Sequence, residues 1–132
     1  MAARKVADPV AQTFDPVTLA AFRDEIEVDV ETLSAGHGAR RVTIWIVVVA
    51  GTPYVRSYRG PEGRWYQNLL IEPRGAIHVN GRRVPFCALP AADPETVKAV
   101  SAALSAKYAD DPATPAMLVP SVLGTTLRLQ PA

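Results

Sequence analysis

The sequence predicts an α+β domain in which six mostly antiparallel strands close into a small barrel, with two to three helices. Short connections between the predicted strands, and a segment 42–50 that is apolar on both faces, favour a barrel over an open sheet. The chain has 132 residues, of which 48% are apolar, enough for one buried core. We therefore expect a single domain over residues 14–132 that follows a flexible N-terminal arm, residues 1–13.

The start of the domain predicts one helix and one strand. Asp15 followed by Pro16 is typical of a helix start, and apolar residues continue to Phe22. Residues 25–31 then alternate strictly between apolar and acidic side chains, which predicts a half-exposed strand with an acidic outer face. The residues that this strand should bury are Ile26, Val28 and Val30.

The middle of the chain predicts a central hairpin. Segment 42–50 is rich in β-branched residues and is expected to be a buried strand, and residues 51–53 turn it into a second strand over 54–58. So short a turn fixes the antiparallel register and places Arg41 opposite Arg59. One end of this hairpin would then be strongly basic.

A short helix should follow the hairpin. It begins near Pro61, because proline suits the first helical position, and keeps Trp65 and Leu69 on one face. It must stop by Glu72, because Pro73 follows. The helix is therefore about three turns long.

The remaining elements are a second hairpin, a longer helix and a last strand. Asn80-Gly81 supplies the two positive φ angles of a type I′ turn between strands over 76–79 and 84–89. Pro85 lacks an amide hydrogen, which predicts an edge position or a bulge for the returning strand. Asp93 caps a helix that runs to about residue 109, and residues 125–129 form the last strand.

The charges are strongly segregated although the net charge is only +1. Residues 40–83 hold eight arginines, two glutamates and no lysine, whereas the first 39 residues hold seven acidic and three basic side chains. Arginine favours planar, bidentate recognition of phosphate or carboxylate. The middle of the chain is therefore the place to look for an anion site.

A candidate anion site surrounds the start of the predicted helix near Pro61. The free N–H groups and the positive dipole end of that helix would face the preceding loop. Hydrogen-bonding side chains suited to a phosphate gather there, with aromatic rings beside them. The candidate binding residues are Arg56, Ser57, Arg59 and Arg64, with Arg40 and Arg41 approaching and Tyr58, Trp65 and Tyr66 as walls for a planar ring.

The same residues also have a plainer interpretation. The arginines could form a solvated face paired with Glu62, Glu72 and the acidic strand, in which each ion pair contributes little. The helical spacing of Trp65 and Leu69 favours a core position for Trp65 over a ring-stacking one. No role is assigned to His37, His78 or Cys87.

Several classes of site and location are excluded or disfavoured. No glycine-rich mononucleotide or dinucleotide loop and no esterase elbow occurs, and two distant histidines with one cysteine argue against a zinc site. The N-terminus has no signal-peptide pattern, so we expect a cytoplasmic protein. Segment 42–50 has about half of the roughly 20 residues that span a bilayer, so no membrane association is expected.

Four consecutive segments resemble a known superfamily. They are RRVTIWIVVVAG (40–51), TPYVRSYRG (52–60), RWYQNLLIEP (64–73) and GAIHVNGRRV (75–84). Their order, and the Trp-Tyr-x-Asn-Leu pattern at 65–69, resemble the flavin- and deazaflavin-binding split β-barrels, which include pyridoxamine phosphate oxidase and the deazaflavin-dependent nitroreductases. Two departures, Glu72 in place of an Asn before Pro73 and a shorter loop before Trp65, point to an uncharacterised bacterial branch.

The resemblance implies a split β-barrel homodimer with cofactor clefts at the subunit interface, in which the flavin itself performs the chemistry. It also implies that arginine and serine or threonine side chains on the second and third strands hold the cofactor phosphate. The matching positions are Arg41, Thr43, Arg56, Ser57 and Arg64, with Trp65 near the ring. Arg59 joins them on the local reasoning alone.

The leading hypothesis is a flavin- or deazaflavin-dependent oxidoreductase that uses FMN or a deazaflavin, and the substrate is not readable from the sequence. The alternative is a non-catalytic dimeric barrel, without such a cofactor, that binds a small phosphorylated ligand or a partner protein. Single-stranded nucleic acid would suit the arginines and aromatic rings, but the net charge of +1 and the acidic strand count against it.

Overall fold

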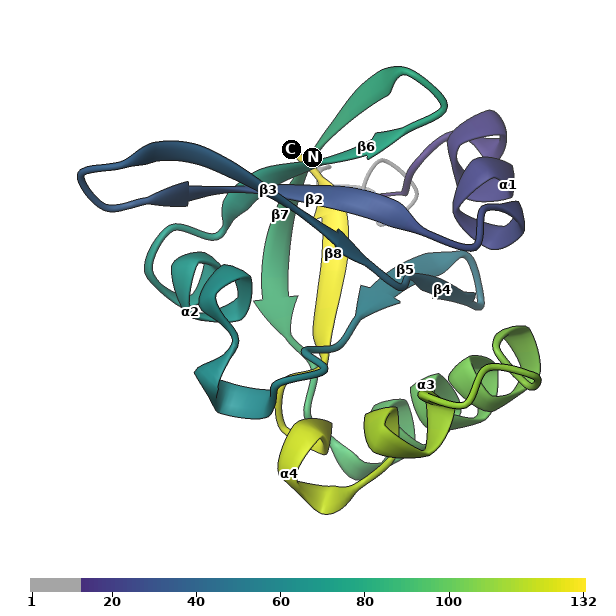
Figure 1. The fold of residues 1–132 in the computed structure, drawn as a ribbon. Helices are drawn as coiled ribbons and strands as arrows, with labels where there is room; N and C mark the ends of the chain where they lie inside the picture. The colour runs from purple at the N-terminus through teal and green to yellow at the C-terminus, as the bar shows by residue number, and fades with distance from the viewer. Residues whose placement is uncertain (1–12) are drawn as a thin grey trace, which may run out of the picture.

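Residues 13–132 are described by a computed structural model, in which seven antiparallel strands form one sheet that curls into a half-barrel (Figure 1). The predicted arm, residues 1–13, lies outside the described residues except for Thr13. The strands are β2 (Val28–Ser34), β3 (Gly38–Ile44), β4 (Val47–Val49), β5 (Thr52–Val55), β6 (Arg74–Val79), β7 (Arg82–Pro90) and β8 (Leu127–Pro131). The helices are α1 (Pro16–Asp24), α2 (Arg64–Ile71), α3 (Pro94–Lys107) and α4 (Pro120–Leu123), with 3-10 turns η2 (Gly60–Glu62) and η3 (Thr114–Met117).

The strand order is β3-β2-β6-β7-β8-β5-β4, so two strands that follow each other in the chain lie at opposite edges of the sheet. This is why the predicted count of six strands is wrong. The extended segment 42–50 breaks at Trp45 and Ile46, where the chain leaves its partner β2 and crosses to β5. An apolar, β-branched run predicts extended backbone but not the point at which it changes partner.

The break also changes the predicted register. β4 and β5 form the expected hairpin only over the three pairs from Val47↔Tyr54 to Val49↔Thr52. Arg41 belongs to β3 and lies opposite Glu31 of β2, so its predicted pairing with Arg59 is wrong.

Local sequence signals predicted α1, α3 and the second hairpin correctly, whereas the short helix α4 was not predicted. Asp15 and Asp93 cap α1 and α3, and each carboxylate accepts the amide N–H three residues further on, at 2.8 and 3.1 Å. Asn80 and Gly81 have φ angles of 51° and 76° and connect β6 to β7 as a two-residue turn.

Helix α2 begins later than predicted. Pro61 lies in the 3-10 turn η2, and Gly63 follows as the N-cap of α2, so the first residue of the α-helix is Arg64. The amide N–H of Gly63 bonds to the carbonyl of Gly60 at 3.1 Å, which closes the turn before the helix starts. The positive end of α2 therefore lies beside Arg64 rather than beside Pro61.

Two strand predictions also need correction. β2 begins at Val28, and Ile26 lies outside it with 58% of its surface exposed. β7 lies between β6 and β8, not at an edge. Its Pro85 is tolerated there because it lies one position beyond the last residue pair with β8, Phe86↔Pro131.

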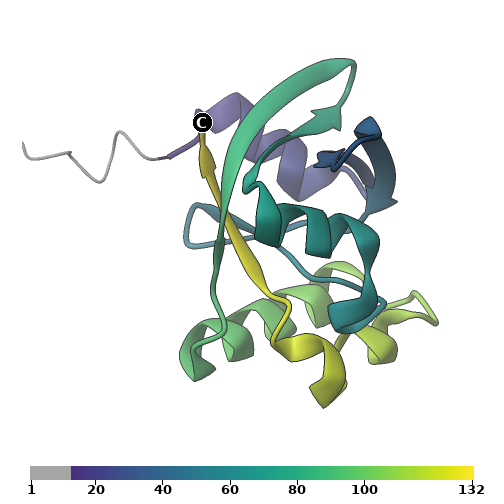
Figure 2. The same ribbon diagram turned by 90° about the vertical axis from the view of Figure 1, so that its left-hand side faces the viewer.

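Two hydrophobic clusters hold the helices against the sheet. The larger one contains Phe22, Trp65 and Phe86 and packs α1 and α2 on the strands. The smaller one contains Val47 and Tyr108 and packs α3 against β4, below the sheet in Figure 1 and along the lower edge in Figure 2. Within residues 13–132, no helix has the length and hydropathy to cross a membrane.

Candidate functional site

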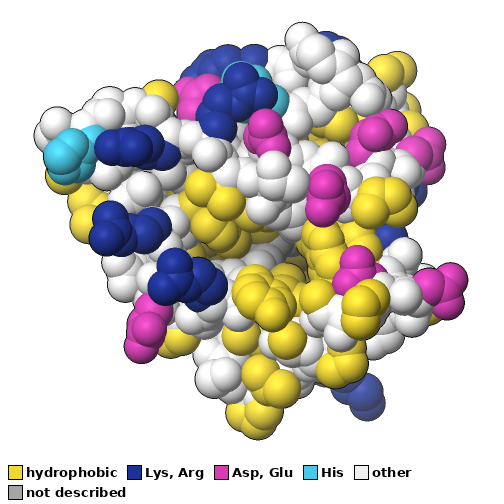
Figure 3. Space-filling model, viewed as in Figure 1, with side chains coloured by type: hydrophobic (Ala, Val, Ile, Leu, Met, Phe, Trp, Pro, Cys, Tyr) yellow, Lys and Arg dark blue, Asp and Glu magenta, His cyan; other side chains and the backbone are white. Residues whose placement is uncertain are grey.

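A cavity of about 620 Å³ opens between β3, α2 and the loop that follows α3. In Figure 3 it is the central hollow with hydrophobic walls; basic side chains lie mostly to its left, and acidic ones mostly above it and to its right. Its volume lies within the range of about 300–1,000 Å³ that is usual for ligand pockets. The cavity is therefore the strongest candidate for a binding site.

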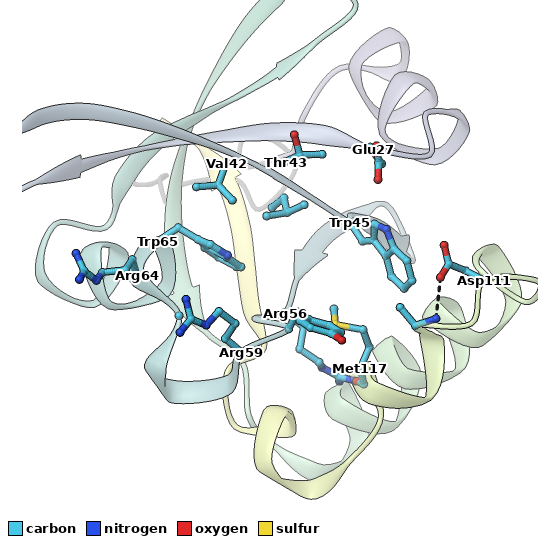
Figure 4. A pocket seen from close by; sticks show the side chains of 14 residues that line it. Glu27, Val42, Thr43, Trp45, Arg56, Arg59, Arg64, Trp65, Asp111 and Met117 are labelled. Carbon is cyan, nitrogen blue, oxygen red and sulfur yellow. Dashed lines mark hydrogen bonds between the residues drawn. The ribbon is translucent and has the colours of Figure 1, made fainter.

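One end of the cavity is cationic. Arg59 and Arg64 line it from the loop before α2 and from the first residue of α2, and both are exposed (Figure 4). Among residues 13–132, neither guanidinium pairs with a carboxylate. The N-cap residue Gly63 has no side chain to accept from the first-turn N–H groups, so these groups and the helix dipole add positive potential at the same end.

Arg56 also lines the cavity, but it is a core residue with 2% of its surface exposed. Its guanidinium makes four hydrogen bonds of 2.9–3.2 Å, to neutral oxygens only; these are Thr126 Oγ1, Ser101 Oγ, and the carbonyls of Met117 and Val97. Burial lowers the pKa of Arg56. This side chain ties α3, η3 and the start of β8 together beneath the cavity, and most of its five N–H donors are already engaged.

Ser57 lies beneath the loop rather than in the cavity. It is fully buried, its amide N–H donates to Thr125 Oγ1 at 3.0 Å, and its own Oγ has no hydrogen-bond partner among the described residues. The hydroxyl lies so close to Gly63 that a Cβ at that position would collide with it. Ser57 therefore explains why glycine stands at the N-cap of α2.

The structure separates three candidate residues of β3, Arg40, Arg41 and Thr43, of which Thr43 alone lines the cavity. Arg41 does not line the cavity; its Nη2 lies 3.3 Å from Asp29 Oδ2. Thr43 lies at the cavity rim, and its hydroxyl donates to the same carboxylate at 2.8 Å. Both side chains are thus held by β2.

Trp65 belongs to both the core and the cavity. It is 8% exposed and packs in the larger hydrophobic cluster, as its spacing from Leu69 predicted. It also contributes to the cavity wall, where Figure 4 shows its ring pointing inward. Tyr58 joins it there, whereas Tyr66 does not line the cavity.

The opposite end of the cavity consists of residues that the sequence analysis missed. They are Trp45, Asp111 and Glu27 (Figure 4). Trp45 was hidden inside an apolar segment that predicted only a buried strand, and Asp111 lies in a loop whose path depends on the packing of α3. No local signal in the sequence joins these three positions.

Outside the cavity, the plainer interpretation holds for Arg41, which pairs with Asp29, and two further arginines of the basic stretch are paired in the same way. Arg83 pairs with Glu31 at 2.9 Å and Arg74 pairs with Glu72 at 3.0 Å. The hydrogen bonds from Arg83, and then the contact with His78 at 2.7 Å, lower the pKa of Glu31 to about 2. These charges are neutralised within the chain.

Comparison with solved structures shows a common fold at low identity. HutZ, described as the heme storage protein of Vibrio cholerae, is 13% identical with a TM-score of 0.68, and 91% of each chain is covered. A putative pyridoxamine 5'-phosphate oxidase from Listeria innocua is 12% identical with a TM-score of 0.60, covering 88% of this chain and 90% of the other. The F420-H2 dependent reductase FDR-A is 15% identical with a TM-score of 0.59, covering 80% and 94%.

These similarities confirm the resemblance to the split-barrel proteins. No curated protein matches the sequence of this chain. One sequence family does match, over residues 18–129, and its description is "Uncharacterized protein conserved in bacteria (DUF2255)". The chain belongs to this bacterial family.

Proposed function

We propose that this protein is a flavin- or deazaflavin-dependent oxidoreductase that binds its cofactor in the 620 Å³ cavity. The observation that carries the proposal is a pair of cavity arginines, Arg59 and Arg64, that have no carboxylate partner among the described residues and stand at the positive end of α2. An anionic group is what such an arrangement binds. The flavin-related proteins among the structural neighbours support the choice of cofactor.

The residues present fit such a cofactor. Arg59, Arg64 and the first-turn N–H groups of α2 would hold a phosphate or carboxylate, and Val42 and Trp65 offer apolar surface to a planar ring. Arg56 adds a buried positive charge beneath them without offering a free guanidinium face. A bound flavin or deazaflavin supplies hydride transfer, while the chain binds and orients it and excludes water.

The proposal includes a homodimer with the cavity at the subunit interface. Val42 and Tyr58, which line the cavity, are 41% and 59% exposed, so apolar surface at its rim is uncovered in the single chain. A second copy would cover this surface and enclose the cavity. Light scattering should give twice the chain mass of 14.2 kDa, and a stable monomer at micromolar concentration would contradict the interfacial site.

The cofactor is tested by titration of the purified protein with FMN and with a deazaflavin. We expect Arg64→Ala to weaken binding of one of them by about 1.5–3 kcal/mol, because it removes a charge-assisted hydrogen bond. Arg74→Ala is the matched control, since Arg74 is exposed but paired with Glu72 away from the cavity. The visible absorbance of the protein as purified gives an independent reading.

Two outcomes would contradict this assignment. Equal affinity of Arg64→Ala, Arg74→Ala and the unaltered protein would remove Arg64 from the site. Failure of both cofactors to bind, with binding of a simple phosphorylated ligand instead, would favour the non-catalytic barrel.

A further inference from the structure

The end of the cavity opposite to the arginines has its own chemistry. Figure 4 shows Arg59 and Arg64 on one side, and Trp45, Asp111 and Glu27 on the other. A ligand that lies across the cavity therefore meets cationic groups at one end, and an aromatic ring with two carboxylates at the other.

Trp45 is a fixed aromatic surface. Its ring stacks on Tyr108 with a centroid distance of 3.9 Å and an angle of 5° between the planes. Tyr108 is itself held, because its hydroxyl donates to the carbonyl of Ile26 at 2.7 Å and accepts from the amide of Ile46 at 3.3 Å. Tyr108 is buried and does not line the cavity, so the part of Trp45 that lines the cavity is not covered by Tyr108.

The two carboxylates beside this ring have no cationic partner in the part of the chain that the structure describes. Asp111 Oδ1 accepts from the amide of Ala113 at 2.8 Å, which fixes the side chain, but neither Asp111 nor Glu27 forms an ion pair within residues 13–132. By contrast, the carboxylates of Asp29, Glu31 and Glu72 each pair with an arginine. The cavity thus keeps negative charge available at the Trp45 end.

We propose that the Trp45 end binds a planar, positively charged group of the substrate, such as a protonated or N-alkylated nitrogen heterocycle. Tryptophan is the side chain that binds cations best through its ring face, and the two carboxylates, which form no ion pair among residues 13–132, also attract a cation. The inference rests on the proposed function, in which the cofactor occupies the end of the cavity that holds Arg59 and Arg64. It narrows the substrate to aromatic cations, as distinct from acids or neutral apolar compounds.

The test compares a planar cation with a neutral ring of nearly the same shape. N-methylquinolinium and quinoline are titrated at pH 7 by calorimetry, with and without saturating FMN. The key variant is Glu27→Gln combined with Asp111→Asn. The matched control is Glu25→Gln combined with Asp110→Asn. Glu25 is close to Glu27 in the sequence and Asp110 precedes Asp111, but neither control residue lines the cavity.

We expect the unaltered protein to bind N-methylquinolinium about tenfold more tightly than quinoline. The Glu27/Asp111 variant should lose about tenfold for the cation and less than about twofold for quinoline, and the control variant should keep both affinities. Equal affinity for the two probes, equal losses in the two double variants, or no binding of the cation would each overturn the inference.

A separate titration with FMN distinguishes this failure from failure of the proposed function. The Glu27/Asp111 variant should retain its FMN affinity, because these residues lie at the other end of the cavity from Arg64. Normal FMN binding without preference for the cation would refute only the substrate class. If FMN binds neither the unaltered protein nor any variant, the cofactor assignment is refuted, whether or not N-methylquinolinium binds.

Discussion

Two groups of arginines in one chain have opposite electrostatic situations. Three strand arginines, one each on β3, β6 and β7, pair with a carboxylate at 2.9–3.3 Å; the pairs are Arg41–Asp29, Arg74–Glu72 and Arg83–Glu31. The cavity arginines, Arg56, Arg59 and Arg64, form no ion pair within the described part of the chain. Of these six arginines, which all fall in the same basic stretch of sequence, Arg59 and Arg64 are the two exposed ones without a carboxylate partner among residues 13–132, so their charge is open to an external anion.

The cavity group is itself divided by burial, and the largest predicted effect tests that division. Arg56→Met should lower the free energy of unfolding by about 2–4 kcal/mol, because it removes the donor to the buried oxygens of Thr126 and Met117 and to the half-buried hydroxyl of Ser101. Arg59→Met is the control, since Arg59 is exposed and should change stability by less than about 0.5 kcal/mol. The urea midpoints of the two variants measure this difference. Similar midpoints would show that the hydrogen bonds of Arg56 do not stabilise the fold.

Trp65 packs in the core and also lines the cavity. Its contribution to stability and its contribution to cofactor binding can therefore be measured separately. Trp65→Phe should cost about 1–3 kcal/mol of stability, because the smaller ring leaves space in the larger hydrophobic cluster. If the ring also forms the cofactor wall, FMN affinity should fall further than the change in stability accounts for. Denaturant midpoints measure the change in stability of this variant, and titration measures its FMN affinity. A large loss of stability with unchanged FMN affinity would show that Trp65 does not form a wall of the cofactor site.

The pair between Arg83 and Glu31 should produce a pH dependence that the cavity arginines lack. Because the folded pKa of Glu31, about 2, lies below its ordinary value of 4.5, its carboxylate stabilises the fold above about pH 4.5. That contribution is lost as the pH falls from about 4.5 to about 2. Glu31→Gln should cost about 1 kcal/mol at pH 7 and almost nothing near pH 2.

Unfolding in urea across this pH range measures the difference between the two proteins. Glu62→Gln serves as the control, because Glu62 forms no ion pair among residues 13–132. A difference between unaltered protein and Glu31→Gln that stayed constant down to pH 2 would contradict the assignment to this carboxylate.

The smallest effect belongs to an exposed strand arginine. Arg41→Ala should change stability by less than about 0.5 kcal/mol, because its contact with Asp29 is long and solvent-screened. It should also leave FMN affinity unchanged, since Arg41 does not line the cavity. A tenfold loss of FMN affinity in this variant would show that the paired strand arginines contribute to cofactor binding as the cavity arginines do.

Elements coded by neighbouring residues were predictable from the sequence, and long-range placement was not. The Asp15 and Asp93 caps and the Asn80-Gly81 turn depend on contacts within a few residues, and the structure has all three. The break of the predicted strand 42–50 depends on which strands lie beside it, so no local pattern marks it.

The candidate site was predictable only in part, for the same reason. The sequence identified Arg59, Arg64 and Trp65, which neighbour one another around α2. It did not predict that Arg56 is buried, because an arginine is expected at the surface unless distant groups satisfy it. Likewise, the meeting of Trp45 with Asp111 requires the packing of α3 against β4.

The hydrogen bonds of Arg56 also have a kinetic consequence. Its partners lie 41 to 70 residues further along the chain, in α3, η3 and just before β8. Contacts of such sequence separation form slowly, because a long loop must close before they contribute any stability. We therefore expect the β2–β3 and β6–β7 hairpins to form early in folding, and the floor of the cavity to assemble last, when the end of the chain docks.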